Sequence, residues 1–154
     1  MSERPPQPGL ELLTRGAVAL GEPLDLGVTP EGHRRVVPIS SGRFEGPRIA
    51  AEVLPGGADW QVIRPGGWVS VLARYTLRAD DGMLISVTSR GLRHGPPEVM
   101  ARLLAGESPD PASYRFRTAV AFEAAEESWV NHVLAICSAV RLPDAVLLDI
   151  YEVT

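Results

Sequence analysis

Short runs of alternating apolar and polar residues extend along most of the chain, with glycine or proline between one run and the next. Because successive side chains of a strand point to opposite faces, each such run has one face for a core and one for solvent. The runs are LLTRGAVAL, HRRVVPIS, RIAAEVL, DWQVIR, WVSVLARYTLR, MLISVTSR, YRFRTAVAFE, NHVLAICSAV and AVLLDIYEV. Short strands at this spacing predict an all-β fold, a barrel or a sandwich.

One segment, GPPEVMARLLAGESPDP, departs from this pattern. It opens with proline and glutamate, continues with good helix formers and stops at Gly106, which are start and stop signals of a helix. We expect a single short helix over residues 97–105 that covers one end of the barrel. Its buried stripe is expected to contain Val99, Leu103 and Met100.

The length and composition fit one globular domain. A chain of 154 residues is long enough for a real core, and a hydrophobic share of 45% is ordinary for such a protein. We expect residues 1–9 to form a flexible polar tail and residues 10–154 to form the barrel. The net charge of −4 argues against nucleic acid as a partner, because phosphates require a clustered basic face.

The chain shows no pattern of a membrane or secreted protein. Its apolar runs are shorter than the roughly 18 residues that a membrane helix needs, and its start lacks the apolar core of a secretion signal. The single cysteine, Cys137, leaves no internal disulfide and lies in the apolar run VLAICSAV, where we expect a buried, inert thiol. We expect a cytoplasmic protein with no membrane partner.

Motifs for metals, nucleotides and covalent catalysis are missing from the sequence. The histidines His33, His94 and His132 form no H-x-H or H-x-x-x-H pair. The glycine-rich stretches lack the G-x-G-x-x-G and Walker patterns, and no G-x-S-x-G elbow marks a nucleophilic serine. We therefore expect no metal site and no cofactor.

Several longer motifs occur in a fixed order: VTPEGHRRVVPISSGRFEGP, EVLPGGADWQ, ARYTLRADDGMLISV, RGLRHGPPEVM, YRFRTAVAFE, WVN and a final YEV. Over nearly the whole chain this set resembles the bacterial and fungal family DUF3237, also called UPF0311. The resemblance implies a closed antiparallel β-barrel of the calycin or allene oxide cyclase type, often dimeric, so we expect a homodimer. It implies no agreed reaction for most members.

The chain departs from the family pattern at two motifs. It has LISVTSRG where the family tends to have LIYVRNRG, and RTAVAFEA where the family tends toward RTTPRFET. The residues that differ are smaller or less polar in this chain. They indicate a pocket that has been reshaped.

Tyr75 is the first candidate for chemistry. In WVSVLARYTLR it shares one face with the apolar residues Val69, Val71, Ala73 and Leu77, which we interpret as the inner face. A phenol in an apolar wall needs a hydrogen-bond partner for its hydroxyl. That partner is either a protein group, as in a satisfied core tyrosine, or a ligand.

Asp59 is the second candidate, and its direction depends on the register of one hairpin. If Gly66 and Gly67 form a two-residue turn, Asp59 lies opposite Arg74 and forms an exposed ion pair worth about 0–1 kcal/mol. Two glycines suit a two-residue turn, because glycine takes positive φ freely, and this register buries Trp60.

If the loop spans residues 65–67, Asp59 instead lies opposite Ala73 and points inward, diagonal to Tyr75. A slip of one residue exchanges every side chain between the two faces. The resemblance, in which GGADW is a signature, favours this inward register, which we adopt. Trp60 takes whichever face Asp59 does not.

An inward aspartate is desolvated, so its pKa rises toward the range useful for a general acid or base. We assign Asp59 as that group and Tyr75 as the donor that stabilises a substrate oxygen. Arg117 is expected to clamp a carboxylate or enolate oxygen, Asn131 to donate to a carbonyl, and Trp129 to close the mouth. The remaining predicted substrate-binding residues are Trp60 and Glu123.

Structural alternatives exist for three of these residues. Arg117 and Glu123 can form a structural ion pair, and Trp129 can belong to the core. The function that we favour is a cofactor-independent isomerase, cyclase or lyase acting on a small hydrophobic, polyketide-like molecule. The alternatives are a non-catalytic small-molecule binding barrel and a structural dimerisation module whose barrel is filled by side chains.

Overall fold

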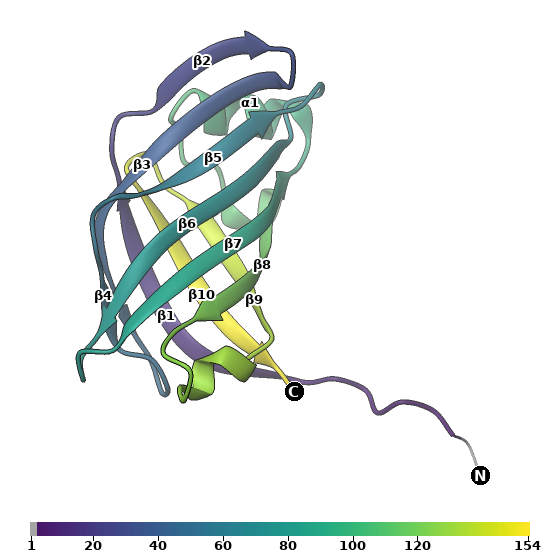
Figure 1. Cartoon of the computed structure of the whole chain (residues 1–154). Coiled ribbons are helices and arrows are strands. Elements are labelled where there is room, and N and C mark those ends of the chain that lie inside the picture. The colour runs from purple at the N-terminus through teal and green to yellow at the C-terminus, as the bar shows by residue number, and fades with distance from the viewer. Residues whose placement is uncertain (1–2) are drawn as a thin grey trace.

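The computed structural model describes residues 3–154 and consists of strands with one α-helix and two short 3₁₀ turns (Figure 1). The strands are β1 (Leu10–Leu20), β2 (Leu24–Thr29), β3 (Gly32–Glu45), β4 (Ala51–Val53), β5 (Gly57–Ile63), β6 (Val69–Ala79), β7 (Leu84–His94), β8 (Arg115–Glu123), β9 (Ala135–Arg141) and β10 (Ala145–Val153). The helical elements are α1 (Pro97–Leu104), η1 (Pro111–Ser113) and η2 (Trp129–His132).

The sheet closes on itself, so the predicted closed antiparallel barrel is confirmed. Its order is β1-β10-β9-β8-β7-β6-β4-β3, and a further pairing of β1 with β3 completes the ring. β5 continues the place of β4 between β3 and β6, while β2 pairs with β3 at the upper edge of the barrel in Figure 1. Closure removes the exposed sheet edges that an open sheet would present along most of its length.

The helix forms where the sequence predicted it, from Pro97 to Leu104, and Met100 and Leu103 are buried. Val99, the third residue of the expected stripe, is partly buried against the core. Figure 1 shows α1 at the upper end of the barrel. A Cβ built on Gly67, in the loop between β5 and β6, would lie 3.3 Å from the Cβ of Met100, so the helix covers this end closely.

Two secondary-structure expectations differ from the structure. β2 was not among the predicted strands, since LDLGVT lacks a clean alternation and Gly27 has a φ of 73°. The run NHVLAICSAV was expected to be a strand from its start, but its first residues belong to η2 and the strand begins at Ala135. The hydroxyl of Ser128 accepts a hydrogen bond from Val130 N at the start of η2, which is how a cap stabilises a helical turn.

The lower half of the barrel interior is apolar and tightly packed. The rings of Phe44 and Tyr75 are nearly parallel, with centroids 6.4 Å apart. A Cβ on Gly16 would lie 2.3 Å from the ring of Phe44, so glycine is required where β1 passes this ring. Cys137 is buried, as predicted. The core continues through Leu13, Leu77, Ile85, Val87 and Ile150.

Residues 3–9 have no regular secondary structure and are exposed, and Figure 1 shows this segment leading away from the barrel. The first residues of the barrel lie beside its last residue, since Gly9 N donates to the carbonyl oxygen of Thr154 at 2.8 Å. Within residues 3–154 no helix has both the length and the apolar character needed to cross a membrane.

Candidate functional site

The loop between β5 and β6 decides the direction of Asp59. Arg64 N donates to the carbonyl oxygen of Trp68 at 2.8 Å, so residues 65–67 form the loop. Asp59 therefore lies opposite Ala73, whose side chain is on the inner face of β6, and Arg74 lies opposite Ala58. The inward register is confirmed, and the structure contains no exterior ion pair between Asp59 and Arg74 within residues 3–154.

The loop reaches this register through its glycines. Gly66 and Gly67 have φ values of 88° and 87°, a conformation that glycine adopts without strain. Gly67 N donates to the carbonyl oxygen of Arg64 at 2.9 Å, which closes the turn inside the loop. Gly66 and Gly67, which suggested a two-residue turn, are therefore two of the three residues of a longer loop.

Asp59 sits in a polar but poorly neutralised environment. Its Oδ2 accepts a hydrogen bond of 2.9 Å from Nε2 of Gln61, while its Oδ1 is buried and has no hydrogen-bond partner among the described residues. Gln61 is itself buried, and its Oε1 has no partner in this part of the chain either. Burial raises the pKa of Asp59, and the Gln61 bond, the charges of Arg93 and Arg141 and the backbone N–H of Leu72 act against that rise.

Inward residues beside Asp59 are small. The registers place Ala73, Ser89, Val120 and Ala135 in one row around the barrel from Asp59. Ala73 faces inward and is only partly buried. The row therefore combines an ionisable group with side chains no larger than valine.

Arg93, which the sequence reasoning did not single out, points into the same part of the interior. It lies on β7 opposite Val69 and Phe116 and is 2% exposed, with its guanidinium carbon 5.5 Å from the centre of the Phe116 ring. Its Nε and Nη1 are buried without a hydrogen-bond partner in residues 3–154. Burial lowers the pKa of Arg93 to about 10. The alternation of β7 was the available signal, since Arg93 shares the inner face with Ile85 and Val87.

Arg141 approaches from the end of β9 and was also missed. Its backbone N donates to the hydroxyl of Tyr114 at 3.0 Å, and its Nη1 is buried without a partner among the described residues. Burial lowers the pKa of Arg141, and the charge of Arg35 on β3 adds to this shift. Neither Arg93 nor Arg141 forms an ion pair with Asp59 within the described range.

Tyr75 lies on the inner face of β6, as predicted, two positions from Ala73 and therefore diagonal to Asp59. Its hydroxyl makes no hydrogen bond to a residue of the described chain, and Oδ2 of Asp59 accepts from Gln61 instead. Burial raises the pKa of Tyr75, and nearby Cys137 adds to that effect. Burial likewise raises the pKa of Cys137 to about 12. Tyr75 is therefore a neutral donor in an apolar wall.

The structure does not bring Arg117 and Glu123 to Asp59. Both are exposed on the outer face of β8, and Nη1 of Arg117 donates to the carbonyl oxygen of Phe116 at 3.0 Å. Six positions along one strand separate their Cα atoms by about 20 Å, so the alternative ion pair between them is absent as well. Trp60 is partly buried and lies opposite Leu72, on the outer side of the barrel.

The side chain of Asn131 forms hydrogen bonds within its own loop. Its Oδ1 accepts from Ala124 N at 2.9 Å, and its Nδ2 donates to the carbonyl oxygens of Ala124 and Ala125 at 3.3 and 2.8 Å. These bonds fix the turn between β8 and η2. The amide that was expected to donate to a substrate carbonyl already has protein partners.

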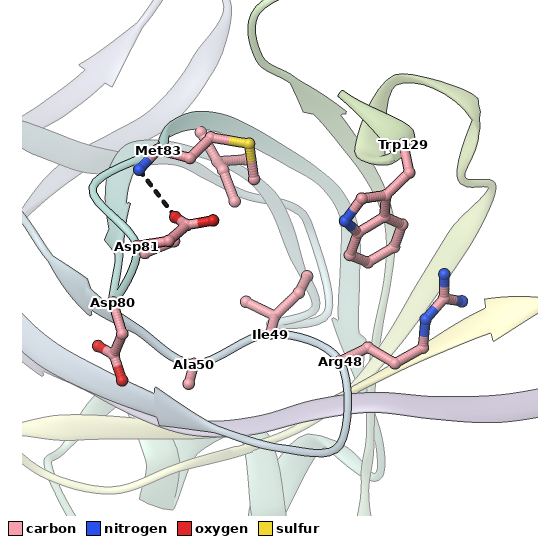
Figure 2. A pocket seen from close by; sticks show the side chains of 9 residues that line it. Arg48, Ile49, Ala50, Asp80, Asp81, Met83 and Trp129 are labelled. Atoms are coloured by element: carbon pink, nitrogen blue, oxygen red, sulfur yellow. Dashed lines mark hydrogen bonds between the residues drawn. The ribbon is translucent and has the colours of Figure 1, made fainter. Parts of the chain in front are cut away.

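Trp129 lies at the lower end of the barrel, far along the fold from α1. It is 38% exposed, and its ring centre is 4.1 Å from the guanidinium carbon of Arg48. Together they border a pocket of about 210 Å³ (Figure 2). Figure 2 shows Asp80 and Asp81 across this pocket from them. The role expected for Trp129, closing the mouth of the substrate site, stays a prediction, and this pocket is at the opposite end of the barrel from Arg93.

These features define a class of protein: a closed antiparallel β-barrel with a buried acid and buried arginines in its interior. The chain belongs to the DUF3237 family, described as a protein of unknown function, whose model matches residues 8–153. It is 39% identical over 125 residues to a UPF0311 protein of Clostridium acetobutylicum, which covers 80% of this chain and 79% of the relative.

Solved structures share the barrel. A beta-barrel like protein of Acinetobacter baumannii has a TM-score of 0.87 and 38% sequence identity, covering 99% of this chain and 100% of that one. An enzyme of Penicillium herquei has a TM-score of 0.73 at 19% identity and covers 100% of both chains. At this sequence identity, the similarity to the Penicillium herquei protein shows a shared fold.

Proposed function

We propose that the barrel interior binds a small carbonyl compound and that Asp59 moves a proton on it without a cofactor. The observation that carries the proposal is the inward carboxyl group of Asp59, which is buried, has one oxygen without a partner in the described chain, and has a raised pKa. A carboxyl group of this kind exchanges protons closer to neutral pH than an exposed one does.

In the proposed step, the carboxylate of Asp59 takes a proton from the carbon next to a substrate carbonyl. The C–H bond breaks, an O–H bond forms on Asp59, and the electron pair moves onto the carbonyl oxygen as an enolate. A donor aimed at that oxygen lowers the barrier, and the guanidinium of Arg93 or the hydroxyl of Tyr75 supplies it. If a carbon–carbon double bond is conjugated with the enolate, return of the proton from Asp59 to the far carbon of that system gives an isomer. If the enolate carbon instead attacks a second carbonyl of the same molecule, a ring forms and Asp59 returns its proton to the new alkoxide.

The fold is compatible with catalysis, since a protein called an enzyme in Penicillium herquei has the same barrel. The side chains in the row beside Asp59 are small, and apolar side chains line the lower part of the interior. Such a lining suits a hydrophobic, polyketide-like substrate. Arg117 and Asn131 have no part in this proposal, because one faces outward and the other is bonded within its loop.

Hydrogen–deuterium exchange tests the proposal without knowledge of the natural substrate. The protein is incubated in D₂O with a panel of aromatic ketones and keto acids, and loss of the α-proton signal is followed by NMR. We expect the wild-type protein to accelerate exchange for at least one compound and Asp59→Asn to abolish that acceleration. The control is Glu31→Gln, which removes an exposed acid and should leave exchange unchanged.

Two outcomes would count against the proposal. Equal exchange by Asp59→Asn and the wild type, with both variants folded by circular dichroism, would remove Asp59 from the chemistry. Compounds that bind without any exchange would make the protein the non-catalytic binding barrel. The expected homodimer stays a prediction, which sedimentation velocity can check.

A further inference from the structure

The upper end of the barrel interior collects more positive than negative charge. Arg93, Arg141 and Arg35 act on one another's electrostatic environment there. Asp59 is the acid that acts on both Arg93 and Arg141, and Asp144, in the turn before β10, acts on Arg141. Arg93 and Arg141 therefore lie in an environment where positive charge from neighbouring arginines acts on both.

Contacts within the described chain neutralise neither Arg93, which is buried, nor Arg141, which is partly buried. Nε and Nη1 of Arg93 and Nη1 of Arg141 are buried and have no hydrogen-bond partner in residues 3–154. No carboxylate oxygen in that range lies within ion-pair distance of either residue. A buried charge without a partner is strongly unfavourable, so three buried N–H groups aimed at the interior point to a group that the chain does not supply.

The surroundings of these groups are apolar on one side and open toward solvent on the other. Val69 and Phe116 flank Arg93 on the neighbouring strands. Arg35 and Arg141 are only partly buried, so the positive cluster reaches the surface at this end of the barrel. An anionic group can therefore arrive through charged surroundings while the body of the same molecule contacts apolar side chains.

We propose that Arg93 and Arg141 bind the carboxylate of a small, mostly apolar molecule inside the barrel. This inference rests on the proposed function, because it names the ligand class for the same interior. The forked guanidinium of arginine matches the two oxygens of a carboxylate. Held there, the body of the ligand lies along the row of small residues that contains Ala73 and Ser89, next to Asp59.

The competing explanation is that Arg93 is purely structural, a cation held over the ring of Phe116. The two explanations predict opposite effects of removing the charge. If Arg93 serves a ligand, Arg93→Met relieves a buried, unneutralised charge and raises the unfolding temperature of the ligand-free protein. If Arg93 instead stabilises the fold through its contact with the Phe116 ring, Arg93→Met lowers the unfolding temperature.

Paired probes test the ligand class directly. Sodium benzoate and sodium 1-naphthoate are titrated into the wild-type protein by calorimetry at constant ionic strength, beside their neutral amides, benzamide and 1-naphthamide, and beside inorganic phosphate. We expect a carboxylate to bind at least about tenfold more tightly than its amide, which corresponds to one guanidinium–carboxylate contact. We expect Arg93→Met and Arg141→Met to lose that preference.

Arg90→Met is the matched control, since Arg90 is an exposed residue on the outer face of the same strand, and it should retain the preference. If Arg93→Met fails to fold, Arg141→Met carries the same comparison. Carboxylates that bind no better than their amides or than phosphate would overturn the proposal, as would an undiminished preference in both arginine variants. Carboxylate binding without proton exchange would support this inference while refuting the proposed reaction.

Discussion

Gln61 donates a hydrogen bond of 2.9 Å from Nε2 to Oδ2 of Asp59, its neighbour two positions earlier on the inner face of β5. The bond neutralises only part of the carboxylate, because Oδ1 has no partner in residues 3–154. It also orients the acid, since Gln61 is almost completely buried and its backbone is held between β3 and β6. The pair therefore holds a carboxyl group with a raised pKa in a fixed place inside the barrel.

Asp59→Asn should stabilise the protein in a pH-dependent way. Because the folded-state pKa is raised, the folded protein binds more protons than the unfolded chain between the ordinary aspartate pKa of about 3.9 and the raised value. The penalty for the buried charge is absent below that window and complete above it. The gain in unfolding free energy from Asp59→Asn should therefore grow as the pH rises through the window and then level off.

Urea denaturation of both proteins at intervals between about pH 4 and pH 8 measures this gain. Glu31→Gln serves as the control, because an exposed acid should give a difference that hardly changes with pH. A gain from Asp59→Asn that stays constant across the range would show that the carboxyl titrates like an exposed one.

Tyr75→Phe should leave the fold intact and reduce α-proton exchange by at least about tenfold, the low end of the effect of removing one oxyanion donor. The ring keeps its packing on Phe44, and only the hydroxyl is lost. Exchange rates and circular dichroism are measured together. Tyr151→Phe on the outer side of β10 is the matched control, and an unchanged rate in Tyr75→Phe would take the phenol out of the mechanism.

Asn131→Ala should lower the free energy of unfolding by about 1–3 kcal/mol, because backbone groups of Ala124 and Ala125 lose their side-chain partner. Ligand affinity in the barrel should be unchanged, since the loop that Asn131 fixes lies at the end opposite Arg93. Urea denaturation and benzoate titration measure the two effects. Weaker benzoate binding at unchanged stability would restore Asn131 as a ligand contact.

Gly16→Ala should destabilise the protein by about 1–3 kcal/mol, the usual cost of overpacking a core, because the new Cβ would overlap the ring of Phe44. The same substitution in a Phe44→Leu background should cost less, since the smaller side chain leaves room. A double-mutant cycle by urea denaturation measures this coupling. Additive effects of the two substitutions would mean that β1 moves aside rather than pressing on the ring.

Much of the fold could be predicted from the sequence because the relevant signals are local. Alternation along WVSVLARYTLR placed Tyr75 on the inner face, and proline, glutamate and glycine marked both ends of α1. The family resemblance added the closed barrel. The failures were local as well: Gly27 obscured β2, and the cap at Ser128 turned the start of an expected strand into η2.

The candidate site was less predictable, because its members meet only after the barrel closes. Arg117 and Asn131 were predicted as site residues from their residue type within motifs. In the structure Arg117 lies on the outer face of β8, and the side chain of Asn131 is hydrogen-bonded within its own loop. Arg93 was passed over, although its position in the alternation of β7 placed it with Ile85 and Val87. A charged residue on an apolar face was the informative signal.

The sequence by itself determined which residues form strands, which face of β6 is apolar and where the single helix begins, because a period of two or of 3.6 is written into neighbouring residues. It left Asp59 open between two registers that differ by one residue. The tertiary structure makes that choice, since β5 pairs with β3 on one side and with β6 on the other, both in the register that turns Asp59 inward. Closure of the barrel also brings Arg93 and Arg141 into the same region from β7 and β9. They are far apart in the sequence, so no pattern of neighbouring residues could predict that they lie near each other.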